Sequence, residues 1–336
     1  MASQNAPQSH KALALGLFFV APLLAEFLLG NLPIKMLPAL IVLAPLYGGG
    51  ALLIREWARR CGRGWPTMVI LAVVYAIVEE AFTTQSLFNP NYLKLNLHLL
   101  DPGYMPVLGI GAWWTLFVLT LHVAWSMSAS IALVEALTPS AAAAPWLGKV
   151  GLTITTLLFI FGAVASTMIG YRQDHYLSAP SQLVCAAIIC VILAMVAFRI
   201  PPLGAIVWRA VPSPWLAGGF TLLAASGVLL IPKNWGWWAA ISVLVLDLSV
   251  LFAVLFWSRS TLWNMRHKLA LASGAALAYA WHSFIQTPAI GGGAFPTRVG
   301  NAIFTAGAIA LIAVAAMKNR DVVTSRPTPI IEAERS

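Results

Sequence analysis

Long apolar runs separated by short polar stretches make up most of the sequence. A membrane-crossing helix needs about 17 to 25 mostly apolar residues, because each residue adds only about 1.5 Å to its length. Ten runs meet this requirement, at residues 12–30, 37–56, 66–88, 111–136, 150–170, 181–198, 215–231, 237–257, 268–286 and 300–317. The pattern predicts an all-α fold, a polytopic transmembrane helical bundle of about ten spans.

Composition and charge agree with this class and predict an orientation. Hydrophobic residues make up 60% of the chain and charged residues 9%, which is typical of a multi-pass integral membrane protein. With the N-terminus inside, 15 of the 20 Lys and Arg residues fall on the cytoplasmic side, as the positive-inside rule requires. We therefore expect both termini in the cytoplasm (N-in and C-in), basic groups in contact with membrane lipids, and no nucleic-acid partner.

The span pattern also divides the chain. Residues 1–11 are predicted to be a cytoplasmic tail, residues 12–317 the transmembrane helical domain, and residues 318–336 a disordered cytoplasmic tail. Ten spans can form two five-helix halves, 12–170 and 181–317, in inverted topology, which is an arrangement found in transporters. The sequence carries no signal for an oligomeric state.

Two adjacent acids, Glu79 and Glu80, interrupt the third predicted span. A charged Asp, Lys or Arg at the middle of a membrane helix is roughly 2.5 to 3.5 kcal/mol unfavourable, so intramembrane acids indicate a functional site with a partner. Adjacent residues on an α-helix point about 100° apart. We therefore expect the two carboxyl groups to face different directions, with Glu79 on the face of Tyr75.

Histidines are the candidate partners of these acids. Helical periodicity places four polar residues within roughly 60° of one another on the fourth span: Thr115, His122, Ser126 and Ser130. The ninth span carries His282, with Gln286 four residues later. We expect His122 and His282 to face the bundle interior.

Three further acids have more than one interpretation. Asp247 stands alone in the eighth span and needs a partner or a proton. Glu26, near the end of the first span, either extends to the lipid headgroups or faces the bundle beside Glu79 and Glu80. Glu56 precedes a group of arginines, and this pattern predicts a solvated helix end that binds lipid phosphate.

Glutamate and histidine together support two kinds of chemistry. A glutamate that activates water beside a histidine that stabilises an oxyanion makes a hydrolytic site. The same side chains can instead bind a divalent metal. The residue types alone leave both alternatives open.

Glu79 and Glu80, followed by His122 and a further histidine, resemble the CPBP group of intramembrane proteases, the CAAX-processing and bacteriocin-processing enzymes. The resemblance implies an intramembrane endopeptidase with Glu79, Glu80, His122 and His282 as catalytic residues. Two positions depart from that pattern, with Thr84 where the group has arginine and Val118 where it has phenylalanine. The chain is also similar to bacterial multi-pass proteins, which implies a bacterial inner (plasma) membrane.

Three functions follow as hypotheses. The first is a membrane-embedded hydrolase for a peptide or small-molecule substrate, with Glu79 or Glu80 as general base and His122 and His282 as oxyanion stabilisers or metal ligands. The second is a proton-coupled transporter that uses Glu79, Glu80, His122 and Asp247. The third is a non-catalytic membrane scaffold.

Overall fold

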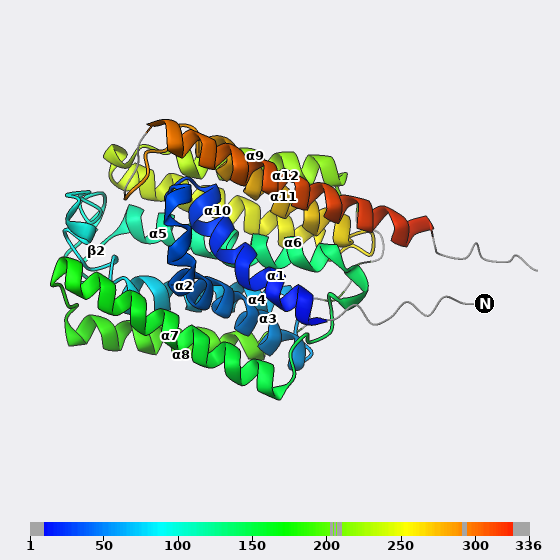
Figure 1. The fold of residues 1–336 in the computed structure, drawn as a ribbon, viewed down its shortest axis with the longest axis horizontal. Coiled ribbons are helices and arrows are strands. Elements are labelled where there is room, and N and C mark those ends of the chain that lie inside the picture. Colours follow the sequence, from blue (N-terminus) through cyan, green and yellow to red (C-terminus); the bar gives the residue numbers. More distant parts are fainter. Residues whose placement is uncertain (1–9, 202–203, 205, 207–209, 291–293, 325–336) are drawn as a thin grey trace, which may run out of the picture.

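The computed structural model describes residues 10–201, 204, 206, 210–290 and 294–324, and these form a bundle of helices (Figure 1). Eight helical stretches in the described part are long and apolar enough to cross a membrane. They are α1 (His10–Pro22) with η1 (Leu23–Leu28); η2 (Ile34–Ala39), α2 (Leu40–Leu43), η3 (Ala44–Gly48) and α3 (Gly49–Arg60); α4 (Trp65–Ile77) with η4 (Val78–Thr83); α5 (Ala112–Thr120), η6 (Leu121–Ala129) and α6 (Ser130–Leu137); α7 (Lys149–Asp174); α8 (Pro180–Arg199); α10 (Trp237–Trp257); and α12 (Ala294–Thr324).

The other two predicted spans are also helices, α9 (Pro214–Leu230) and α11 (Met265–His282). Helix α11 is less apolar because neighbouring helices, not lipid, cover much of it, and its residues from Leu269 to Ala280 are largely buried. A Cβ added at Gly274 would lie 2.3 Å from the carbonyl oxygen of Gly218 on α9, so only glycine allows this close packing. The prediction of an all-α transmembrane bundle is confirmed.

Three short 3-10 segments and one hairpin occur in the connections. The segments are η5 (Tyr92–Lys94), η7 (Pro139–Ala141) and η8 (Lys233–Trp235). Strands β1 (Tyr104–Met105) and β2 (Ile110–Gly111) pair antiparallel in the connection between η4 and α5. We call the end of the bundle that carries residues 84–111 the loop end, and the opposite end, where α3 finishes at Arg60, the arginine end.

Helix α1 starts and α12 finishes at the same end of the bundle (Figure 1), as an even number of crossings requires. Part of the predicted tails is helical, since α1 begins at His10 and α12 continues to Thr324. The rest of both predicted tails, residues 1–9 and 325–336, lies outside the described residues.

The prediction of a solvated helix end around Glu56 is wrong, because Arg55 and Glu56 are both fully buried. The Arg55 guanidinium donates to Glu56 and to Glu135, each at 3.0 Å, and it lies 3.3 Å over the centre of the Trp146 ring. Backbone carbonyls within 141–144 accept further hydrogen bonds from Arg55. The turn after α6 therefore folds over these charges, and the span pattern gave no sign of it.

Four stretches of π-helix interrupt the membrane helices: η1, η3, η4 and η6. A π-helix closes i→i+5 hydrogen bonds and is rare, and its short occurrences concentrate at functional sites. Three of the stretches carry polar residues that the sequence analysis singled out: Glu26 on η1, Glu79 and Glu80 on η4, and His122 with Ser126 on η6. The remaining stretch, η3, carries Tyr47. The irregular turns thus mark one layer of the bundle.

Close packing against α1 holds η3 in place, and this contact can be tested. A Cβ added at Gly48 would lie 2.0 Å from the backbone oxygen of Phe18, whereas a Cβ at Gly16 would meet nothing within 4 Å. We expect Gly48→Ala to destabilise the purified protein by about 3 kcal/mol, the upper part of the range for overpacking. Gly16→Ala, the control, should stabilise it by roughly 0.5 to 1 kcal/mol because alanine favours the helix. Thermal unfolding in detergent measures both, and equal effects would contradict the packing argument.

The orientation of the bundle remains a prediction with a direct test. Cys61 is exposed at the arginine end, and His98 is exposed at the loop end. In a single-cysteine protein that keeps Cys61, a membrane-impermeant maleimide should react only after the cells are permeabilised. A variant with His98→Cys as its single cysteine should react in intact cells, and the reverse result would invert the assignment.

Candidate functional site

Glu79 and Glu80 both contact the ring of His122, which lies between them. Glu80 Oε1 lies 2.7 Å from His122 Nε2, and Glu79 Oε2 lies 3.2 Å from Nδ1. All three side chains are buried, with exposed fractions of 2%, 5% and 6%. The expectation that the carboxyl groups face different directions is wrong, because the chain is π-helical at η4 and because an imidazole offers a nitrogen on each side.

Glu80 is the fully hydrogen-bonded member of the pair. Besides His122, its carboxylate accepts from the Ser86 hydroxyl and from the Thr84 hydroxyl, which lies 3.0 Å from Oε2. The Trp114 indole in turn donates to the Ser86 oxygen at 2.9 Å. These donors fix the direction of the carboxylate, and Thr84 supplies one of them at the position where the CPBP pattern has arginine.

Glu79 is the less satisfied member. Its Oε2 atom is within ion-pair distance of His122 Nδ1, yet it has no hydrogen-bond partner, and we infer that the two atoms are poorly aligned for a hydrogen bond. The buried hydroxyl of Tyr75 lies beside the Glu79 carboxylate and within its reach, but makes no hydrogen bond of good geometry. Unpaired buried polar atoms are unfavourable, so their concentration at one point indicates a place for a ligand, a proton or water.

Two tyrosine rings enclose this group, Tyr47 at 5.9 Å and Tyr75 at 6.0 Å from the His122 ring centre. The Tyr47 hydroxyl donates to Glu26 at 2.6 Å, and Asn31 donates to the same carboxylate. Glu26 therefore faces the bundle, the second of its two interpretations. It joins the site through Tyr47.

The polar face of the fourth span contributes one contact beyond His122. The Ser126 hydroxyl lies 3.4 Å from His122 Nδ1, at the long end of the hydrogen-bond range. Thr115 and Ser130 instead donate to backbone carbonyls of their own helix. Helical periodicity grouped these residues on one face, but only one hydroxyl reaches the site.

His282 and Asp247 lie apart from the three residues. In the part of the chain that the structure describes, no hydrogen bond, ion pair or ring contact joins His282 to Glu79, Glu80 or His122. Its ring packs edge-on against Trp281, and its Nδ1 is buried without a hydrogen-bond partner. Asp247 accepts a hydrogen bond from Thr120 at 2.7 Å, which supplies the partner that its depth demands.

The residues missed by the sequence analysis differ in the signal that they carry. Tyr75 precedes Glu79 by four positions, so helical periodicity placed it on the correct face. Tyr47 belongs to another span and Ser86 follows the end of the helix, and neither position has a periodic relation to the acids. Their contacts depend on tertiary packing.

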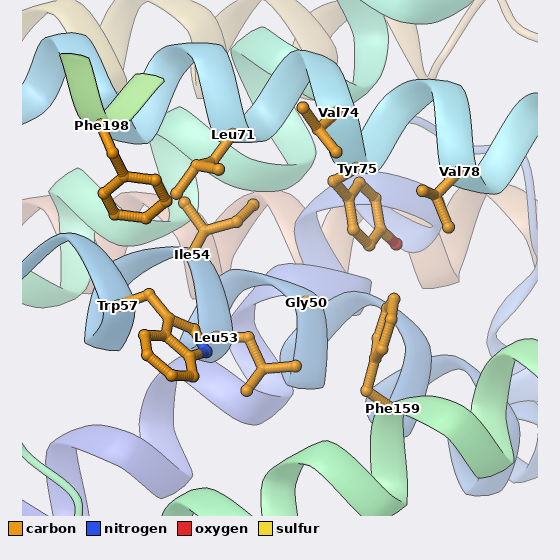
Figure 2. Close-up of a pocket in the computed structure, with 10 residues that line it drawn as sticks. All are labelled: Gly50, Leu53, Ile54, Trp57, Leu71, Val74, Tyr75, Val78, Phe159 and Phe198. Carbon is orange, nitrogen blue, oxygen red and sulfur yellow. The ribbon is translucent and has the colours of Figure 1, made fainter. Parts of the chain in front are cut away.

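An apolar groove of about 380 Å³ lies next to the site, between α3, α4, α7 and α8. Figure 2 shows the Tyr75 ring projecting from α4 into this groove, with Phe159 and Val78 beside it. A Cβ added at Gly50 would lie 2.3 Å from the Tyr75 ring, so the glycine makes room for it. Tyr75 therefore separates the apolar groove from the polar residues around Glu79.

Glu79, Glu80 and His122 are also suitable metal ligands. Each offers one ligand atom, and the three atoms lie within 4.8 Å of one another. Carboxylate oxygen and imidazole nitrogen are ligands of zinc, manganese and iron in proteins.

Comparison with known proteins gives a family and no activity. No curated protein and no solved structure matches the chain. The resemblance to the CPBP group finds no support in these comparisons. A family model does match residues 15–319, nearly the whole chain, and the chain therefore belongs to an uncharacterized membrane protein family.

Proposed function

We propose that the protein is a membrane-embedded hydrolase with Glu79 as its general base, acting on a peptide or a small molecule. One observation carries the proposal: Glu79 Oε2 is buried without a hydrogen-bond partner, while the neighbouring Glu80 is held by three donors. A general base needs a free lone pair at the point where water binds. Of the two candidate bases, the contacts favour Glu79.

In this scheme the substrate is an amide. Water beside Glu79 gives up a proton to its carboxylate as the water oxygen adds to the carbonyl carbon. The Tyr75 hydroxyl, which makes no well-aligned hydrogen bond within the protein, donates to the developing oxyanion. The C–N bond then breaks, the proton passes from Glu79 to the leaving nitrogen, and the products are a carboxylic acid and an amine.

His122 and Glu80 position the base in this scheme. His122 contacts both glutamates, and Glu80 is anchored through Ser86 and Trp114 at the loop end. His282 has no part in it, because its contacts lie elsewhere. The lipid-side groove next to Tyr75 offers a route for the apolar part of a substrate that arrives from the bilayer.

The hydrogen bond between Glu26 and Tyr47 favours a second candidate, a proton-coupled carrier. It extends the set of ionisable groups from the His122 cluster to a half-buried acid on the first span. Chains of such groups are the usual proton path in transporters. The two-halves arrangement of residues 12–170 and 181–317 would suit this function.

We expect Glu79→Gln to lower hydrolysis by about 10²- to 10⁴-fold, because removing a general base typically has that effect. Mass spectrometry of peptides from membranes that carry the wild-type or variant protein measures it without a known substrate. Asp247→Asn is the matched control, since it also neutralises an intramembrane acid but lies away from His122.

Peptide profiles that are the same with wild-type protein, with Glu79→Gln and with no protein would contradict a peptide hydrolase. If proteoliposomes that contain the wild-type protein take up a solute in response to a proton gradient, and Glu79→Gln abolishes this uptake, the result would instead support the carrier. A bacterial plasma membrane remains the predicted location of the protein.

A further inference from the structure

The hydrogen bonds of Glu80 determine which nitrogen of His122 carries the proton. Glu80 accepts from the hydroxyls of Ser86 and Thr84, as an ionised carboxylate does. With Oε2 occupied by these hydroxyls and Oε1 facing the ring at 2.7 Å, the hydrogen-bond network assigns the proton of His122 to Nε2, which donates to Oε1. In the neutral ring, Nδ1 then carries a lone pair, whose one hydrogen-bond contact among the described residues is the Ser126 hydroxyl at 3.4 Å.

That lone pair lies opposite another acceptor. Glu79 Oε2 is 3.2 Å from Nδ1 and has no hydrogen-bond partner. Two acceptors at this distance repel each other unless something electrophilic lies between or beside them. A proton on Nδ1 would give a well-aligned hydrogen bond, which the geometry does not show.

The spacing is that of two ligands on one cation. Metal–ligand bonds of about 2.0 to 2.2 Å at a tetrahedral ion place the ligand atoms roughly 3.3 to 3.6 Å apart. The observed 3.2 Å is close to this range. The buried Tyr75 hydroxyl lies beside the same carboxylate, makes no hydrogen bond of good geometry, and is a further ligand within reach.

Charge and surroundings agree with a cation here. Two ionised glutamates would bring two negative charges into a low-dielectric layer, and a divalent cation would balance them. A metal-bound histidine usually donates its other N–H to a carboxylate, which is what Glu80 accepts from Nε2. Glu80 therefore has the place of an outer carboxylate that orients the ligand.

We propose that Glu79 Oε2 and His122 Nδ1 bind one divalent transition-metal cation of the zinc or manganese class, with Glu80 as the orienting carboxylate. The inference rests on the proposed function for the role of the ion, which would polarise the attacking water. Glu79 would then hold the ion through Oε2 and take the proton of the water through its other oxygen, Oε1. Binding itself requires no turnover. The two proposals can therefore fail separately.

The test measures metal in the full-length protein purified in detergent. After equilibrium dialysis against Zn²⁺, elemental analysis should find about one ion per chain, and Glu79→Gln or His122→Ala should abolish it. Glu80→Gln should weaken Zn²⁺ binding by about 10- to 100-fold without abolishing it, the usual effect of losing an orienting partner. His282→Ala and His98→Ala are the controls and should bind Zn²⁺ as the wild type does.

A second measurement needs no variant. Co²⁺ added to the wild-type protein should give visible absorption bands of a four- or five-coordinate site, and Zn²⁺ should displace them. Absence of stoichiometric Zn²⁺, or Zn²⁺ that survives both Glu79→Gln and His122→Ala, would overturn the proposal. Turnover by protein shown to be metal-free would overturn the role of the ion in polarising water and leave the hydrolase intact. Bound Zn²⁺ without any hydrolysis would support the cation site and contradict the hydrolase.

Discussion

The contact of one imidazole with two carboxylates is the interaction on which the centre of this bundle depends. A bilayer supplies no water to solvate charge, so every ionisable group at that depth must find its partner within the protein. His122 meets this demand for Glu79 and Glu80 together. Because the acids come from the third span and the histidine from the fourth, the same contact fixes how these two spans face each other.

The bundle reaches this arrangement by local departures from the α-helix. Adjacent residues on a regular α-helix diverge, and the π-helical turn η4 is where Glu79 and Glu80 reach one ring. Glycines then bring the neighbouring helices close, since Gly48 touches the backbone of α1 and Gly50 makes room for Tyr75. Irregular backbone and small residues thus place large polar side chains where regular helices would not.

Much of this organisation was predictable from the sequence, and the rest was not, for physical reasons. Hydropathy marks the spans, and the energy of burying charge predicts that Glu79 and Glu80 need a partner such as His122. Hydropathy does not reveal the π-helical stretch η4, because an irregular backbone does not change the periodicity of the residues. Nor does it reveal that a turn folds over Arg55 and Glu56, since charged residues at a helix end are solvated unless tertiary contacts bury them.

Glu79 and Glu80 are adjacent and chemically identical, yet their roles differ because each makes different contacts besides the one with His122. Glu80 also accepts from Ser86, which the Trp114 indole holds in turn, and so it serves as a fixed acceptor. Glu79 points to the tyrosines and keeps an oxygen free. A water, a transported proton or a metal ion would each bind at that oxygen, so the asymmetry between the glutamates, more than their number, is what makes this site capable of chemistry.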